Sequence, residues 1–282
     1  MRARAHEVLD AAHAAGVRYF DCARSYGRSE EFLSAWLTDR GLTRDDLAVG
    51  SKWGYRYGAD WRVDTGGEPH EVKDHSLAHF LSQKVETLEF LGDHIRLYQI
   101  HSATIASGVL ENQEVLDALL KMREETGLRL GLSLSGVEQG ETLRKAIATG
   151  VFDSVQATWN LLEQSAGPAL EEASKAGMQV IVKEAMANGR VLRHPALIVA
   201  ASDLGVPADA LALAAAMAQP FRAVVLSGAV TTAQLESNMQ SLAVAEMLKS
   251  TDKGAAALQR LLAEMRVDPE ANWKERSQLS WN

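Results

Sequence analysis

The sequence predicts an α/β protein with parallel strands, and two observations support this. Short runs rich in β-branched and aromatic residues alternate with helical periods along most of the 282 residues. Each predicted strand is followed by a helix, a repetition that implies parallel strands joined by right-handed crossovers. Seven such units, preceded by one further helix, fit a (β/α)8 barrel of the TIM type that lacks its first strand better than they fit a doubly wound sheet.

The predicted strands are short and end before loops. They cover residues 17–22, 47–53, 95–101, 129–135, 154–160, 179–185 and 223–228. Most of the predicted helices cover residues 4–15, 29–39, 112–126, 140–149, 165–176, 207–218 and 231–248. Residues 54–73, which contain Gly66, Gly67 and Pro69, are expected to form a long irregular loop, and a second irregular loop is expected before Pro207.

One further helix is predicted after Asp74, whose carboxylate can cap its N-terminus. Apolar residues recur there at intervals of three and four, which predicts a single buried stripe. The stripe comprises Leu77, Phe80, Leu81, Val85, Leu88 and Leu91.

Composition is that of a globular protein and shows no break that would mark a domain boundary. Residues 1–282 are therefore predicted to form a single barrel domain, with residues 249–282 as a C-terminal tail. The net charge of −8 argues against nucleic-acid and anionic-membrane partners, which require a basic face. The chain has a single cysteine, Cys22, and shows neither a signal segment nor an apolar run of ~20 residues. These observations favour a cytoplasmic protein.

Ionisable residues stand where three consecutive predicted strands end. Asp21 ends the first, Lys52 the second and His101 the third, and Tyr26 follows Asp21 by five residues. In parallel barrels the C-terminal ends of the strands carry the chemistry, so these four side chains should share one mouth. Taken singly, an Asp, Lys or His at a strand end is usually a cap or a surface ion pair.

This set suits proton delivery to a carbonyl oxygen. An ammonium near a tyrosine lowers the pKa of the phenol and makes it a better acid, and Lys52 can supply that ammonium. Asp21 can supply the counter-charge that Lys52 needs in a barrel mouth. His101 can donate a hydrogen bond that orients the carbonyl.

The same residues resemble the aldo-keto reductase family in type, order and flanking sequence. The matching words are Asp-x-Ala-x-x-Tyr-Gly from Asp21 to Gly27, Ser51-Lys52, and Tyr-Gln-Ile-His ending at His101. The resemblance runs from about Ala5 to Asn238. It implies catalytic roles for Asp21, Tyr26, Lys52 and His101, and a nicotinamide cofactor, NADP or NAD, that supplies the hydride.

The resemblance also implies residues that hold the nicotinamide. Ser133 and Gln156 match the family's contacts to the nicotinamide amide, whereas Leu134 stands where an asparagine is usual. Lys183 stands where many relatives place an aromatic residue against the nicotinamide ring. If the Lys183 ammonium faces that ring, reduced cofactor should bind more tightly than oxidised cofactor.

The segment from Leu226 to Asn238 is similar to the family's cofactor-phosphate segment. Its candidate binding residues are Ser227, Gly228, Gln234 and Asn238. Gly228 permits a close backbone approach, and the following helix offers free N–H groups to an anion. An ordinary strand–turn–helix is the alternative interpretation, and the choice between NAD and NADP stays open because Lys and Arg are absent at positions 228 and 234.

We therefore expect an NAD(P)-dependent oxidoreductase that interconverts an aldehyde, ketone or sugar lactol with its alcohol or lactone. One alternative is a barrel aldolase with Lys52 as a Schiff-base nucleophile. Another is a nicotinamide-binding regulator without catalytic activity, which Leu134 and Lys183 favour and the four intact strand-end residues oppose. No metal is expected, since His75 and His79, one helical turn apart, have no further ligand on the same element.

The missing first strand carries an expectation of its own. Without it, the strands at Tyr19-Phe20 and Val224-Val225 would be edges with unpaired backbone groups. We expect that the natural protein starts upstream of Met1, or that residues 254–282 cover the gap.

Overall fold

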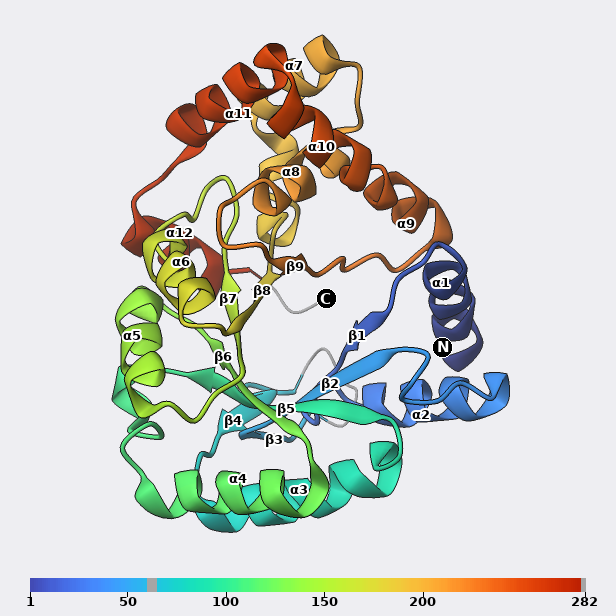
Figure 1. Ribbon diagram of the computed structural model, residues 1–282, viewed down its shortest axis with the longest axis vertical. Helices are drawn as coiled ribbons and strands as arrows, with labels where there is room; N and C mark the ends of the chain where they lie inside the picture. Colours follow the sequence, from blue (N-terminus) through green and yellow to red (C-terminus); the bar gives the residue numbers. More distant parts are fainter. Residues whose placement is uncertain (60–64, 280–282) are drawn as a thin grey trace. The chain divides into compact units, whose positions relative to one another are not determined.

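A computed structural model describes residues 1–59 and 65–279, which form two compact units (Figure 1). The first unit comprises Met1–Ser135 and Lys145–Ser154. The second comprises Gly136–Arg144 and Val155–Leu279. Of the predicted tail, residues 280–282 lie outside the described part of the chain.

The first unit is built on four parallel strands in the order β1-β2-β5-β6. They are β1 (Tyr19–Asp21), β2 (Ala48–Trp53), β5 (Ile95–Ala103) and β6 (Arg129–Leu134). The helices of this unit are α1 (Arg2–Ala14), α2 (Ser29–Arg40), α3 (Leu77–Leu91) and α4 (Gln113–Thr126), with a short 3-10 turn, η1 (Ile105–Ser107). Helix α5 (Gln139–Thr149) runs from the second unit into the first.

The register of the strands places the predicted site residues close to one another on adjacent strands. Asp21 lies opposite Gly50, and Lys52 lies opposite Gln99. Because parallel strands end at a common edge, Asp21, Lys52 and the end of β5 are brought together there.

The prediction that residues 54–73 form an irregular loop is wrong in part. Tyr55–Tyr57 (β3) and Glu71–Lys73 (β4) form an antiparallel two-stranded ribbon, in which Tyr55 pairs with Lys73. The pairing joins residues at both ends of the segment, so no local pattern indicates it. Residues 60–64 lie outside the described part.

The predictions of the N-cap residue and of the buried apolar stripe of α3 are also wrong in part. Ser76, not Asp74, caps the helix by accepting the N–H of His79, and Asp74 accepts the N–H of Ser76. Leu81 is 47% exposed and Val85 is 56% exposed, whereas Phe80 and Leu91 are fully buried.

Two polar residues on the buried face of α3, Gln83 and Thr87, have hydrogen-bond partners there. Gln83 accepts the N–H of Gly54 and donates to the carbonyl of Tyr55, both at 2.9 Å. Thr87 donates to the Glu30 carboxylate at 2.9 Å. The apolar spacing alone therefore predicts the wrong buried face of α3, because it omits the buried residues Gln83 and Thr87.

The second unit contains three strands in the order β7-β8-β9. They are β7 (Ser154–Thr158), β8 (Gln179–Lys183) and β9 (Val224–Val225). Its helices are α6 (Gly167–Lys175), α7 (Pro195–Leu204), α8 (Ala208–Met217), α9 (Thr232–Met239), α10 (Ser241–Ser250), α11 (Asp252–Met265) and α12 (Pro269–Ser277), with two 3-10 turns, η2 (Ala187–Gly189) and η3 (Val191–Arg193).

Three expectations for this unit are corrected. Helix α7 lies in the segment expected to be a loop before Pro207, and the strand expected at 223–228 is only two residues long. The helix expected at 231–248 is two helices, α9 and α10, separated at Gln240. Neither Gly nor Pro stands at that break, so the sequence contains no signal for it.

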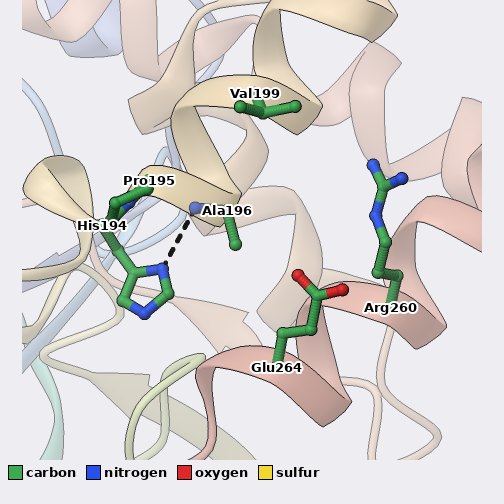
Figure 2. A pocket seen from close by; sticks show the side chains of 6 residues that line it. All are labelled: His194, Pro195, Ala196, Val199, Arg260 and Glu264. Atoms are coloured by element: carbon green, nitrogen blue, oxygen red, sulfur yellow. Dashed lines mark hydrogen bonds between the residues drawn. The ribbon is translucent and has the colours of Figure 1, made fainter.

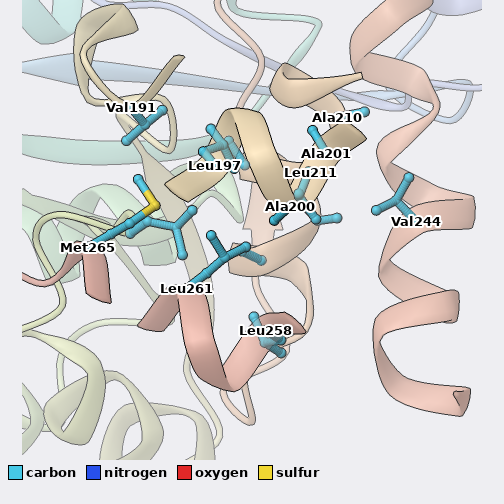
Figure 3. Packing of buried hydrophobic residues seen from close by; sticks show 14 of the residues in the cluster. Val191, Leu197, Ala200, Ala201, Ala210, Leu211, Val244, Leu258, Leu261 and Met265 are labelled. Atoms are coloured by element: carbon cyan, nitrogen blue, oxygen red, sulfur yellow. The ribbon is translucent and has the colours of Figure 1, made fainter. Parts of the chain in front are cut away.

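Helices α7, α8, α10 and α11 share one apolar core (Figure 3). Small side chains such as Ala200 and Ala210 let the helices approach, and Leu197, Leu261 and Met265 fill the space between them. Helix α7 packs into this core through one face only: Leu197, Ala200 and Ala201 are buried, whereas Ile198 and Val199 are exposed.

Within residues 1–59 and 65–279, no single helix has the length and apolar composition needed to cross a membrane. Helices α7 and α8 would meet that requirement only as a pair, and they are bent by 94° relative to each other.

The α3 packing gives a stability prediction. Phe80 is fully buried, and its ring centroid lies 4.9 Å from that of Trp53 on β2. Phe80→Ala should lower the free energy of unfolding by ~3–5 kcal/mol, because it removes this contact and leaves a cavity. Leu81→Ala, the adjacent control, should change it by less than ~0.5 kcal/mol. Urea unfolding measures both, and an equal loss in the two variants would show that the buried face of α3 is assigned incorrectly.

Candidate active site

The first unit brings Asp21, Tyr26, Lys52 and His101 together at one edge of its sheet. Asp21 is the last residue of β1, Lys52 lies in β2 and His101 lies in β5. Tyr26 follows β1 in a turn whose backbone is tied to β2, since Arg24 donates its N–H to the carbonyl of Lys52. All four therefore come from elements of the same sheet or the loop attached to it.

Lys52 and Asp21 form a buried ion pair. The Lys52 ammonium donates to Asp21 Oδ2 and, at 2.9 Å, to the carbonyl of Cys22. The side chain of Lys52 is fully buried and that of Asp21 is 8% exposed. Burial alone would lower the pKa of Lys52, but the Asp21 carboxylate and Tyr26 outweigh it and raise this pKa. Lys52 is therefore an ammonium at neutral pH.

Asp21 accepts two further hydrogen bonds that the sequence did not indicate. The hydroxyl of Tyr19 donates to Asp21 Oδ1 at 2.9 Å, and the Gln99 amide donates to the same oxygen at 3.4 Å. Tyr19 precedes Asp21 by two residues, so both side chains lie on one face of β1. That spacing is the only signal that could have identified Tyr19. Cys22, the residue after β1, is buried.

Tyr26 contacts both Lys52 and His101. The Lys52 ammonium lies 4.8 Å from the centroid of the Tyr26 ring, and the Tyr26 hydroxyl lies 3.4 Å from His101 Nε2. Burial raises the pKa of Tyr26 and Lys52 opposes this, with a net rise. Because Tyr26 is 47% exposed, water limits the effect of burial. Lys52 lowers the pKa of Tyr26 as expected, but in the protein without cofactor or substrate the effect of burial is larger.

His101 is held from several sides. Its Nδ1 lies 3.3 Å from the Ser25 hydroxyl, and the Tyr55 ring packs edge-on against the imidazole at 4.9 Å between centroids. His75 donates from Nε2 to the His101 carbonyl at 2.8 Å. Burial lowers the pKa of His75 to about 4, so this imidazole is neutral near pH 7. Ser25 was not identified from the sequence, and His75 was considered there only as a metal ligand.

The backbone after His101 connects the site to Ser133. Ser102 adopts a left-handed conformation, with φ of 54°, and donates its N–H to the Ser133 hydroxyl at 2.9 Å. Lys73 of β4 donates to the Ser102 carbonyl at 2.8 Å. Ser133, a predicted nicotinamide contact, is thus fully buried beside the end of β5.

In the second unit, the residues predicted for the cofactor phosphate form one connected group around the N-terminus of α9. Asn238 is buried, and its amide is hydrogen-bonded to the Ser227 hydroxyl at 2.8 Å. Gln234 accepts the N–H of Val230 at 2.9 Å, and Thr231 caps the helix through the N–H of Gln234. Gly228 is exposed, and apart from its two chain neighbours no atom of the described residues lies within 4 Å of the position that a Cβ would take.

This group fits a phosphate. The loop is held in shape by Ser227, Gln234 and Asn238, its glycine leaves the backbone open, and it ends at the N-terminus of an eight-residue helix. The residues present could therefore hold the phosphate of a nicotinamide cofactor without a lysine or arginine at positions 228 and 234.

Lys183 is paired within its own unit. Its ammonium donates to the Thr158 hydroxyl at 3.0 Å and lies 3.5 Å from the Glu184 carboxylate. Glu184 in turn accepts hydrogen bonds from the Arg276 guanidinium of α12 at both carboxylate oxygens. The Lys183 charge is therefore offset by Glu184, which reduces the repulsion that it could exert on an oxidised nicotinamide ring. Gln156, the remaining predicted contact, is buried on β7.

An open pocket of about 520 Å³ lies elsewhere in the second unit (Figure 2). It is lined by His194 and Pro195 at the start of α7 and by Arg260 and Glu264 of α11. None of the residues predicted for catalysis or cofactor binding lines it. Among residues 1–59 and 65–279, no group of three His, Cys, Asp or Glu residues is placed to hold a metal ion.

Comparison with known proteins defines the class. The sequence model of the Aldo/keto reductase family matches residues 1–255. The chain therefore belongs to the aldo/keto reductase family. Membership implies an oxidoreductase that uses a nicotinamide cofactor and small-molecule carbonyl substrates.

Individual relatives are distant. The chain is 26% identical to the uncharacterized oxidoreductase YqkF of Bacillus subtilis (strain 168), over 91% of this chain and 87% of that protein. It is 28% identical to the aldo-keto reductase str7 of Strobilurus tenacellus, over 65% of this chain, and the match spans half the length of that relative.

Solved structures support the fold. The holo form of the aldo-keto reductase AKR11C1 from Bacillus halodurans is similar at a TM-score of 0.73, with 22% identity, over 93% of this chain and 88% of that chain. The predicted fold class, an α/β barrel of the TIM type, is thereby confirmed.

The Glu184 cluster gives a prediction about pH. Burial raises the pKa of Glu184, but Lys183 and Arg276 outweigh it and hold the pKa at about 2. Because this pKa is lower in the folded than in the unfolded chain, the carboxylate stabilises the fold at neutral pH, and the contribution is lost as the pH falls toward 2. Glu184→Gln should thus be less stable than wild type near pH 7, and the difference should shrink below about pH 5.

Urea unfolding at about pH 7, 4 and 3 tests this expectation. Glu275→Gln is the control on α12, because the Glu275 side chain is 64% exposed and its pair with Arg190 should contribute little. A difference between wild type and Glu184→Gln that does not change with pH would contradict the account.

Proposed function

We propose that the protein catalyses NAD(P)-dependent reduction of an aldehyde, ketone or sugar lactol, and the reverse oxidation, with Tyr26 as the general acid or base. The observation that carries this proposal is the position of Lys52. Its ammonium is fully buried, paired with Asp21, and lies 4.8 Å from the centroid of the Tyr26 ring. A cation fixed at that distance stabilises the phenolate that remains after Tyr26 gives up its proton.

His101 supports the same reaction by orienting the carbonyl. If its Nδ1 accepts from the Ser25 hydroxyl, then Nε2 carries the proton and points to the Tyr26 hydroxyl, 3.4 Å away. A carbonyl oxygen placed between these groups would receive a hydrogen bond from Nε2 and the proton from Tyr26. Tyr55, packed against the imidazole, keeps it in this orientation.

The residues proposed to hold the cofactor are Ser133, Gln156 and Lys183 for the nicotinamide, and Ser227, Gly228, Gln234 and Asn238 for the phosphate. When bound, the cofactor supplies the hydride, which no side chain can provide. Positions 228 and 234 carry no cationic side chain that would select the 2′-phosphate of NADP, so we propose NADP or NAD.

The charge of Lys52 argues against the Schiff-base alternative. A nucleophilic lysine must be a neutral amine, and aldolase-type lysines have lowered pKa values. Here Asp21 and Tyr26 raise the pKa of Lys52 above its ordinary value in spite of burial. Borohydride with a carbonyl substrate should therefore leave no covalent adduct on Lys52.

Replacing Tyr26 tests the proposal directly. Tyr26→Phe keeps the ring and removes only the transferable proton, so reduction should fall by ~10²–10⁴-fold while cofactor affinity stays nearly unchanged. The assay follows nicotinamide absorbance with a panel of aldehydes, ketones and sugars, with both NADPH and NADH. Fluorescence titration of the cofactor measures binding separately.

Tyr98→Phe is the matched control. Tyr98 is buried on β5, and its hydroxyl meets Thr87 at 3.4 Å. This variant should keep its activity within a few-fold of wild type. Activity of Tyr26→Phe at the level of Tyr98→Phe would exclude Tyr26 as the acid, and a wild-type chain that binds cofactor but reduces none of the panel would favour the regulator.

A further inference from the structure

The Asp21 carboxylate is held by more donors than its pairing with Lys52 requires. Tyr19 donates to Oδ1 at 2.9 Å, while Lys52 donates to Oδ2. The two oxygens of one carboxylate are thus used by two different partners, and Gln99 adds a longer contact to Oδ1 at 3.4 Å. A carboxylate bound through both oxygens cannot rotate about its χ2 angle without losing one of these bonds.

The sheet makes room for the Tyr19 phenol at one position. Gly50 of β2 lies opposite Asp21, and a Cβ on Gly50 would collide with the Tyr19 hydroxyl and lie 3.0 Å from its Cζ. Gly50 is in the middle of a strand, where glycine weakens the sheet and is retained when another group must approach closely. The phenol therefore occupies a space that exists because residue 50 has no side chain.

The Tyr19 phenol is a donor over the whole working range of pH. Burial and the Asp21 carboxylate raise the pKa of Tyr19 well above its ordinary value. Its proton consequently remains on the oxygen and directed at Asp21.

We propose that Tyr19 is a positioning residue, whose hydroxyl fixes the Asp21 carboxylate on Lys52 and so sets the charge that this ion pair presents to Tyr26. The catalytic consequence rests on the function proposed above, whereas the coupling of Tyr19 to Tyr26 is a property of the protein alone. Tyr19 touches neither Tyr26 nor a substrate in this account, and it acts only through Asp21.

The direction of the effect follows from the charges around Tyr26. These are Lys52 of β2, which favours the phenolate, and Asp21 of β1 and Glu71 of β4, which oppose it. His101 of β5 faces the hydroxyl. Without the Tyr19 hydroxyl, the negative charge of the Asp21 carboxylate is no longer partly neutralised by a hydrogen bond at Oδ1. That charge acts on Tyr26 directly and also offsets Lys52 more completely, so both effects make the Tyr26 phenol harder to ionise.

The experiment measures the ionisation of Tyr26 by NMR of protein labelled with ring-¹³C tyrosine, without cofactor or substrate. Tyr26→Phe assigns the signal, and circular dichroism at each pH defines the range in which the chain stays folded. We expect Tyr19→Phe to move the titration midpoint of Tyr26 upward by about half a pH unit or more. Tyr98→Phe, which removes a buried hydroxyl that meets Thr87, should leave the midpoint unchanged.

Gly50→Ala provides a second, independent test. Its methyl group must displace the Tyr19 hydroxyl, so this variant should move the midpoint in the same direction as Tyr19→Phe. In the Tyr19→Phe background the same change should have a smaller effect, because the hydroxyl that it displaces is gone. If Gly50→Ala does not fold, the comparison of Tyr19→Phe with Tyr98→Phe decides alone.

Kinetics then connect the coupling to the proposed reaction. Tyr19→Phe should lower kcat by about 3- to 10-fold with little change in KM, since it alters proton transfer and not substrate contacts. An unchanged Tyr26 midpoint in Tyr19→Phe would overturn the inference. Failure of the proposed function would be seen separately, as full activity in Tyr26→Phe.

Discussion

The first unit depends on one buried ion pair. Lys52 is fully buried, and a cation there is tolerated only because Asp21 lies against it and the Cys22 carbonyl accepts a second hydrogen bond at 2.9 Å. Taking two charges out of water costs several kcal/mol per ion before their attraction offsets it, so the pair requires good geometry and satisfied hydrogen bonds. The arrangement around Asp21 meets this requirement, since Tyr19 and Gln99 use the oxygen that Lys52 leaves available.

The pair also determines what the neighbouring groups can do. Tyr26 is half-exposed and the Lys52 ammonium lies 4.8 Å from the centroid of its ring, so a phenol that a substrate can reach stands beside a fixed cation. His101 is placed independently, by Ser25, Tyr55 and the His75 contact to its backbone. Charge is thus provided from β1 and β2, and orientation from β5 and the β3–β4 ribbon. This division of roles is the one that the proposed reduction of a carbonyl requires.

The sequence predicted the parts that depend on residue type and spacing along the chain. Asp21, Lys52 and His101 at successive strand ends, with Tyr26 five residues after Asp21, were sufficient to bring the four together in one place. Features that depend on packing between distant segments could not be predicted. The buried face of α3 carries Gln83 and Thr87 because Gly54 and Glu30 lie beneath them, and Leu81 and Val85 are left outside. The contact of Tyr19 with Asp21 likewise depends on the space above Gly50 in the adjacent strand.

A double-mutant cycle on Asp21 and Lys52 tests the central claim most directly. Asp21→Asn and Lys52→Met should each lower the free energy of unfolding by ~3–5 kcal/mol, because each leaves an uncompensated buried charge. The double variant removes both charges and should be no less stable than either single variant, which corresponds to a large favourable coupling energy. Unfolding free energies of the two single variants that simply add in the double variant would show that the two residues do not depend on each other, and would contradict the account.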